Sequence, residues 1–307
     1  MNGKNRRFAV VDCLYILLMA VPIAAAIVLK ILTAPPSDGI QITGARIFFK
    51  VPMPIQDLPI TESQINSWLL LISVLGLCLF LTHGLKVRAD TKRQHAVEWI
   101  IEKAEGLVRS NMGEYFMGFA PFIAAILALS ALSSLLSLFG LYPPTSDLNV
   151  VAGWAILVFC LITYYKMKCG PIQYLKSFAE PVPLLAPMNV LSEVATPLSM
   201  AFRHYGNVLS GTVIAALVAT GLQGLSRLLL GWLPGFLGEI PFLQIGIPAV
   251  LSVYFDLFSG CLQAYIFAML TMMYVSGGFP ADLYFAKMKQ KDKQMHNNIT
   301  LEEMKHV

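Results

Sequence analysis

The sequence predicts an all-α polytopic membrane protein with about six spans. Hydrophobic residues make up 56% of its 307 positions, whereas Asp, Glu, Lys and Arg make up 13%, about half the roughly 25% of a soluble domain. The mean hydropathy is +0.66, and the apolar residues gather into runs long enough to cross a bilayer. These observations argue against a soluble enzyme, a nucleic-acid-binding protein and a disordered scaffold.

Four apolar runs have the length of a single span, about 20 residues for about 30 Å of hydrocarbon. They are Val11–Leu32, Trp68–Leu85, Phe119–Leu141 and Asn149–Tyr165. The first run follows a basic N-terminus, as a signal peptide would. It exceeds the usual signal core of about 7–15 residues and is followed by Pro35-Pro36 rather than a small-residue cleavage site, which favours a retained span over a cleaved signal.

The remaining apolar sequence forms two stretches that are too long for upright spans. They are Pro181–Ser226 and Ile240–Ala281, with 46 and 42 residues. Even about 30 helical residues cover about 45 Å, and an average tilt of about 20° cannot absorb that excess. We therefore expect either strongly tilted helices or helices that begin along the membrane surface, with Pro197 and Pro248 permitting a bend.

Basic residues outside the spans indicate the orientation. Six crossings place 17 of the 22 Lys and Arg residues on one side of the membrane. These are Lys4, Arg6, Arg7, Lys86, Arg88, Lys92, Arg93, Lys103, Arg109, Lys166, Lys168, Lys176, Lys287, Lys289, Lys291, Lys293 and Lys305. The other side receives Arg46, Lys50 and Arg227. The positive-inside rule then predicts that both termini are cytoplasmic.

Three regions are expected along the chain. Residues 1–66 hold an N-terminal span and an external segment, residues 67–286 form a helical membrane domain, and residues 287–307 form a charged cytoplasmic tail. Within the membrane domain, Ala89–Val108 has the spacing of a cytoplasmic amphipathic helix. The five cysteines form no CxxC pair or Cys/His cluster, and no nucleotide-binding or hydrolase motif occurs. We therefore expect no disulfide framework, no metal or cofactor, and no catalysis within this chain.

Arg203 is the first candidate for function, because a charge inside a span costs at least about 2.5–3.5 kcal/mol. The surrounding stretch extends 22 residues before Arg203 and 23 after it, which argues against a side chain snorkelling from a helix end. Ser199, Asn207 and Ser210 lie on the same helical face. We interpret Arg203 as a functional side chain that faces the interior.

Asp256 is the single formal charge in the last apolar stretch. Ser259, Gly260 and Gln263 follow it on one helical face, and Tyr274 extends the polar line. A carboxylate placed for proton or cation relay is one interpretation, and a buried structural Asp is the other.

Two further acids have weaker signals. Asp147 lies with Asn149 beside Pro143-Pro144, in residue types that favour a turn. Glu193 precedes Arg203 by ten residues, where a tilted helix is still near the cytoplasmic face.

Two motifs in this sequence resemble subunit a of the F-type ATP synthase, the stator subunit of the membrane sector, in its bacterial form. Pro197–Asn207, PLSMAFRHYGN, is similar to the family's signature around its essential arginine. Leu262–Thr271, LQAYIFAMLT, is similar to the signature on the family's last helix, and Pro144–Val150 resembles its external loop. The resemblance covers roughly residues 62 to 280.

The resemblance implies a stator beside a rotating ring of c subunits, with the two long helices forming a tilted antiparallel hairpin. Arg203 would attract the ring carboxylate and block direct proton leakage between two aqueous half-channels, and Gln263 would support it. Asp256, Asn207 and Tyr274 would line the half-channels. The full set of candidate ion-translocation residues is Arg203, Gln263, Asp256, Asn207, Tyr274, Ser199, Asp147 and Glu193, with Asp147 near the external mouth.

The sequence departs from the family pattern at three points. The position after Gly211 is often acidic in the family but is Thr212 here, and Asp256 would supply the acid from the opposing helix. His204-Tyr205 replaces the commoner Leu-Phe. The first span is additional, and its role is open.

The implied partners are the c-subunit ring, the b subunits of the peripheral stalk, the rest of the F-type ATP synthase and the lipid bilayer. The implied location is the inner (plasma) membrane of a bacterium, with H⁺ or Na⁺ as the coupling ion. An independent ion channel or secondary transporter is the alternative function, and a structural membrane scaffold is a third.

Overall fold

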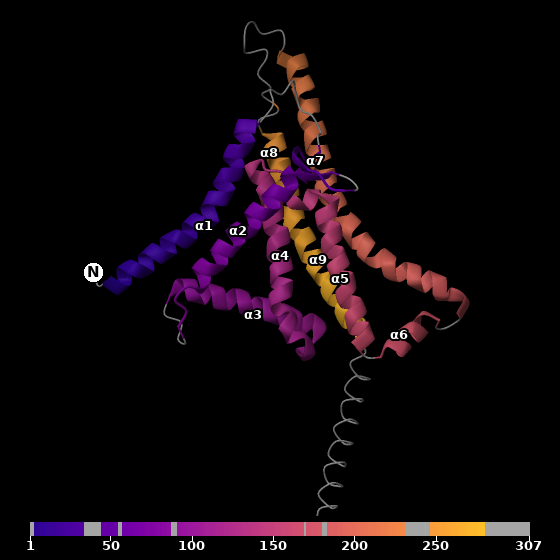
Figure 1. Cartoon of the computed structure of the whole chain (residues 1–307). Helices are drawn as coiled ribbons and strands as arrows, with labels where there is room; N and C mark the ends of the chain where they lie inside the picture. Colours follow the sequence, from indigo (N-terminus) through magenta and orange to yellow (C-terminus); the bar gives the residue numbers. More distant parts are fainter. Residues whose placement is uncertain are drawn as a thin grey trace, which may run out of the picture.

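The chain is described by a computed structural model over residues 3–33, 44–54, 57–86, 91–168, 170–179, 183–230, 243 and 246–279. Helices dominate this part of the chain (Figure 1). The α-helices are α1 Gly3–Thr33, α2 Glu62–Thr82, α3 Lys92–Met112, α4 Ala120–Leu135, α5 Leu148–Lys168, α6 Pro171–Phe178, α7 Ala186–Leu230, α8 Ile247–Ser252 and α9 Gly260–Gly277. Short 3-10 turns are η1 Glu114–Phe119, η2 Leu136–Phe139, η3 Pro144–Ser146 and η4 Pro183–Leu185.

Among the described residues, six helical segments are long and apolar enough to cross a membrane, which confirms the predicted fold class. They are Val10–Thr33, Glu62–Thr82, Glu114–Phe139, Leu148–Lys168, Pro183–Leu229 and Ile247–Gly277. Many large apolar side chains on these helices are exposed, as expected where lipid is the solvent.

The last two segments are the overlong pair that the sequence predicts. Helix α7 has 45 residues and contains Pro197, and it curves visibly along its length (Figure 1). Its partner is a continuous run of α8, the π-helix η7 (Val253–Ser259) and α9. Pro248, which the sequence allows as a bend point, lies in the first turn of α8, where proline needs no bend. The irregularity lies in η7 instead.

A two-stranded antiparallel sheet lies in the segment before α2 and was not predicted. Strand β1 (Ile47–Val51) pairs with β2 (Leu58–Thr61), with a register irregularity between Ile47 and Phe49. The strands are rich in β-branched and aromatic residues, which suit a pleated surface. We call this end of the helix bundle the β-side, and the opposite end, where α3 and α6 lie, the α6-side (Figure 1).

Helix α3 is the expected amphipathic helix, shifted by a few residues. The Thr91 side chain accepts a hydrogen bond from the Gln94 amide, and Gly113 ends the helix with φ +84°, a conformation that suits glycine. Val97 is buried, as its spacing predicts, whereas Ile100 is exposed.

The buried core lies between α4, α5 and α9. Ile123 and Ile126 of α4 pack with Phe267 and Met272 of α9 in one apolar cluster. Close approach of the two helices depends on Gly260, because a Cβ there would lie 2.5 Å from Ser134 Cβ. This contact fixes the start of α9 against α4.

Four of the five cysteines lie within the described residues. Cys13, Cys78, Cys160 and Cys261 are free. No group of three His, Cys, Asp or Glu side chains in the described ranges could hold a metal ion. Cys169 and the tail at 287–307 lie outside the described residues.

Candidate ion-translocation site

Helix α7 and the continuous run of α8, η7 and α9 pack against each other in a regular antiparallel register. Asn207 Nδ2 donates to the Ser259 carbonyl at 3.4 Å, and Ser259 Oγ donates to Asn207 Oδ1 at 3.0 Å. Four residues further along α7, Gly211 lies against Phe255, four residues back along the partner helix. A step of four in the other direction brings Arg203 to the level of Gln263.

Arg203 is exposed on the outside of this chain. Among the described residues it has no hydrogen-bond or ion-pair partner. The expectation that it faces the interior of the chain is therefore wrong. The neighbouring Leu198 and Phe202 side chains are exposed as well, at 52% and 51%. An unpaired guanidinium in an apolar, outward-facing surface can receive a carboxylate that is supplied from outside the chain.

Gln263 of α9 and the glycines Gly206 and Gly211 of α7 have different surroundings. The Gln263 side chain is buried, with 6% exposure. Gly211 allows close approach of the partner helix, since a Cβ there would lie 3.1 Å from Phe255 Cβ. Gly206 has no neighbouring atom within 4 Å of such a Cβ, so it faces away from the described parts of the bundle.

A cavity of about 420 Å³ opens on the β-side of Arg203. Its lining combines α7, η7 and the segment after α4, and includes Ser137, Tyr142, Tyr205, Thr212, Ser252 and Asp256. Asp256 is the single carboxylate among its described lining residues. A π-helical turn often occurs at a functional position, and here η7 places Asp256 in the cavity wall.

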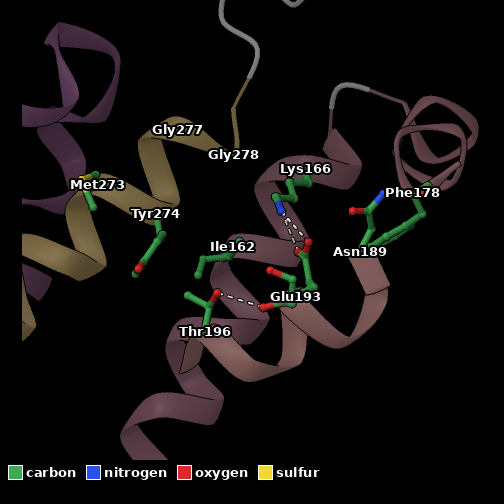
Figure 2. A pocket seen from close by; sticks show the side chains of 11 residues that line it. Ile162, Lys166, Phe178, Asn189, Glu193, Thr196, Met273, Tyr274, Gly277 and Gly278 are labelled. Carbon is green, nitrogen blue, oxygen red and sulfur yellow. Dashed lines mark hydrogen bonds and ion pairs between the residues drawn. The ribbon is translucent and has the colours of Figure 1, made fainter. Parts of the chain in front are cut away.

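A second cavity, of about 370 Å³, lies on the α6-side of Arg203. It is lined by Glu193 and Thr196 of α7, Lys166 of α5 and Tyr274 of α9, among others (Figure 2). Lys166 Nζ lies 2.7 Å from both carboxylate oxygens of Glu193, and the two side chains are 27% and 13% exposed. The cavity therefore contains a well-formed and partly buried ion pair.

Tyr174 of α6 closes one side of this ion pair. Its hydroxyl donates to Glu193 Oε1 at 3.4 Å. Burial, and then the negative charge of Glu193, raise the pKa of Tyr174 above its usual value. The phenol therefore stays neutral and acts as a donor to the carboxylate.

Asp147 and Ser199 lie outside both cavity walls. Asp147 Oδ1 accepts from the Asn149 amide at 3.0 Å, and its Oδ2 accepts from Ser63 Oγ at 2.6 Å, so it caps α5 and joins it to the start of α2. The turn that the sequence suggested at this position is confirmed. Ser199 is exposed one turn before Arg203.

Three side chains near these cavities are absent from the set inferred from the sequence. Lys166, a cation outside the spans in the sequence, lines the α6-side cavity. Lys30 of α1 lines the β-side cavity. His204 is fully buried, with Nε2 3.3 Å from Ser130 Oγ and its ring edge-on to Trp154 and Phe267. Its position beside Arg203 was visible in the sequence, but which neighbours it meets depends on the packing of α4, α5 and α9.

The predicted residues thus form a line through the bundle and not a single cluster. Asp256 lies at one cavity, Glu193 and Tyr274 at the other, and Arg203 at the level of Gln263 between them. The arrangement therefore offers one carboxylate in each of two cavities, with an exposed guanidinium between them.

The chain is similar to known proteins over most of its length. The family model described as "ATP synthase A chain" matches residues 65–276. "ATP synthase subunit a" of Priestia megaterium is 32% identical over 243 residues, covering 74% of this chain and 97% of that protein.

Two other relatives give the same result. "ATP synthase subunit a" of Legionella pneumophila is 29% identical over 229 residues, covering 74% of this chain and 90% of the relative. "ATP synthase subunit a 1" of Crocosphaera subtropica is 30% identical over 227 residues, covering 73% and 89%. With a family match over more than half of its residues and an exposed arginine between two cavities, this chain belongs to the ATP synthase subunit a family.

Proposed function

We propose that this chain, as the non-catalytic stator subunit of the ATP synthase membrane sector, passes protons through two half-channels that meet at Arg203. The observation that carries the proposal is the position of Arg203, unpaired among the described residues and between two cavities that lie toward opposite ends of the bundle. Each cavity contains a carboxylate, so each can relay protons between water and the centre of the membrane.

Arg203 would hold a carboxylate of the c-subunit ring at the point where the ring passes this chain. A guanidinium keeps its proton in proteins, so it can attract the charged carboxylate without carrying a proton across. Gln263, at the same level on the opposing helix, would support Arg203 while it holds the ring carboxylate. The exposed apolar side chains around Arg203 would face the ring.

The β-side cavity would be the external half-channel. Asp256 would accept a proton from the external water and pass it toward the ring, with Tyr205 and Thr212 providing hydroxyl groups along the wall. Asn207 and Ser259 would hold the two long helices in register. Asp147, through its cap on α5, would keep the outer end of the bundle in place.

The α6-side cavity would be the cytoplasmic half-channel. Glu193 would accept the proton that Arg203 displaces from the ring, and the Tyr274 hydroxyl would offer a hydrogen-bonding step in the cavity wall. Ser199 would lie on the way from Arg203 to this cavity. This assignment rests on the positive-inside rule, which predicts that α3, α6 and both termini would lie on the cytoplasmic side of a bacterial plasma membrane. The b subunits of the peripheral stalk would hold the chain against rotation.

The two half-channels can be tested by labelling from each side of the membrane. In a variant without the five native cysteines, we expect Ser252→Cys to react with a membrane-impermeant thiol reagent added externally, and Ser192→Cys to react from the cytoplasmic side. Ser130→Cys is the control and should stay unreactive because Ser130 is fully buried. Reaction of both cavity positions from one side would contradict the proposal.

Glu193→Gln is expected to lower proton-driven ATP synthesis several-fold, because it leaves the Lys166 ammonium without its carboxylate in a partly buried cavity. Adding Lys166→Gln should restore part of the rate, since it removes the unpaired charge. The measurement is the rate of ATP synthesis in vesicles at a fixed proton-motive force. Glu114→Gln is the matched control, because its ion pair with Arg109 is exposed and should contribute little. An unchanged rate of ATP synthesis in the Glu193→Gln single variant would exclude Glu193 from the pathway.

An independent channel would conduct ions without the rest of the complex. We expect the purified chain in liposomes to carry no steady proton current, because the proposed route is completed only by a ring carboxylate. A voltage-driven current through the purified chain would favour the channel.

A further inference from the structure

In the sequence, helix α1 precedes the region that matches the family, which begins at residue 65. The middle of α1 nevertheless packs closely against the bundle. A Cβ at Gly76 of α2 would lie 2.8 Å from the Met19 backbone nitrogen. This is backbone-to-backbone packing, of the kind that small residues allow between membrane helices. Helix α1 is therefore a fitted part of the structure and not a loosely attached anchor.

Polar contacts hold both ends of α1. At the α6-side, Asp12 Oδ1 lies 2.8 Å from His83 Nδ1 and 3.2 Å from Arg93 Nη1. At the β-side, Arg46 Nη1 donates to the Thr33 carbonyl at 2.8 Å. These contacts fix the height of α1 relative to α2, and so the position of each side chain along it.

This attachment places Lys30 in the wall of the β-side cavity, together with Asp256. The Lys30 ammonium lies near Gly140, 3.9 Å from where a Cβ of that residue would be. A narrow cleft beside Lys30 contains Arg46 and Glu62. Within the described residues, Lys30 makes no ion pair with Glu62 or any other carboxylate.

The charges that face Asp256 in this cavity are few. Among the described lining residues, Lys30 is the single cation and Asp256 the single anion, and the other ionisable groups are the phenols of Tyr142 and Tyr205. Gly140 and Ser137, from the segment after α4, add no charge. A positive charge in the same cavity as a carboxylate favours the carboxylate's charged form.

We propose that Lys30 is a positioning residue of the external half-channel, whose ammonium sets the external pH at which Asp256 takes up protons and helps Asp256 to release them toward the ring. The inference rests on the proposed function of the β-side cavity. It assigns the additional N-terminal helix a role in proton uptake.

The test uses the complete ATP synthase in proteoliposomes, with the ATP-forming sector outside and the β-side facing the lumen. The rate of ATP synthesis is measured at a fixed voltage while the lumen pH is varied. In Lys30→Met we expect the lumen pH at half-maximal rate to rise by about half to one unit, the size expected for loss of one charge in such a cavity. Lys30→Arg should keep the original value, because it keeps the charge.

Two controls separate charge from packing. Lys50→Met removes another cation of the β-side, which is exposed and does not line the cavity, so its half-maximal lumen pH should stay unchanged. Varying the outer pH instead of the lumen pH should give the same profile for Lys30→Met and the original protein. A lower maximal rate with an unshifted half-maximal pH in Lys30→Met would overturn the inference, as would equal shifts in the Met and Arg variants.

Failure of this inference can be told apart from failure of the proposed function. If Ser252→Cys is labelled from the external side but Lys30→Met leaves the profile in place, only the role of Lys30 is wrong. If Ser252→Cys is not labelled from that side, the β-side cavity is not the external half-channel, and both conclusions fall together.

Discussion

Arg203→Ala is expected to abolish proton-driven ATP synthesis in the assembled complex, with a loss of at least about 100-fold, the scale for removing a preorganised charge. The guanidinium has no hydrogen-bond or ion-pair partner among the described residues, so its removal breaks no such interaction there and assembly should persist. Without it, a ring carboxylate could carry its proton directly from one cavity to the other. We therefore expect a passive proton leak through the membrane sector as a second effect.

The measurement combines ATP synthesis with dye-detected proton leak in membranes stripped of the ATP-forming sector. Arg227→Ala is the matched control, because Arg227 lies on the same helix, in its last turn and exposed, and should leave both readouts unchanged. Proton-driven ATP synthesis that persists in Arg203→Ala would contradict the proposed function.

Gly260→Ala is expected to lower the amount of assembled subunit in the membrane by about tenfold or more, since overpacking of a tight core contact costs about 1–3 kcal/mol. The added Cβ would lie 2.5 Å from Ser134 Cβ and 2.8 Å from Ser134 Oγ. One of the two helices must then move, and with it the start of α9 and the nearby Asp256. Subunit abundance is measured by immunoblotting of membranes.

A second substitution makes this prediction specific. Ser134→Gly removes both atoms that the new methyl group meets, so the double variant should recover much of the lost subunit. Gly221→Ala on α7 is the control, because a Cβ there meets no atom within 4 Å. If Gly260→Ala assembles normally, or if Ser134→Gly brings no recovery, the α4–α9 contact is not as close as described.

Much of the fold could be predicted because the thickness of the bilayer determines how many consecutive apolar residues a span needs. Each single span appears as about 20 apolar residues, and the overlong pair appears as two stretches that exceed this length. The helix ends differ by several residues, as at α2, which begins at Glu62 rather than Trp68. The strands β1 and β2 were missed because their short, Pro-containing segment has no clear alternation.

The candidate site was predicted less completely than the fold. Arg203 and Asp256 could be found because a formal charge inside a span is costly and therefore rare. Lys166 and Lys30 could not be assigned to the cavities, because each lies near a helix end, where a cation has an ordinary explanation. Their role depends on which helix end lies opposite, as Lys166 and Glu193 illustrate.

By itself the sequence determined the membrane class, the six spans, the overlong helices and the two charges that remain deep within them. These follow from the cost of placing polar groups in hydrocarbon, which acts on each residue independently of its neighbours in space. Only the tertiary structure decided that Arg203 faces outward, that η7 presents Asp256 to one cavity, and that α1 brings Lys30 to the same wall. These depend on how helices pack and at what height, which is set by contacts such as Gly76 with Met19 and Gly260 with Ser134 between residues far apart in the chain.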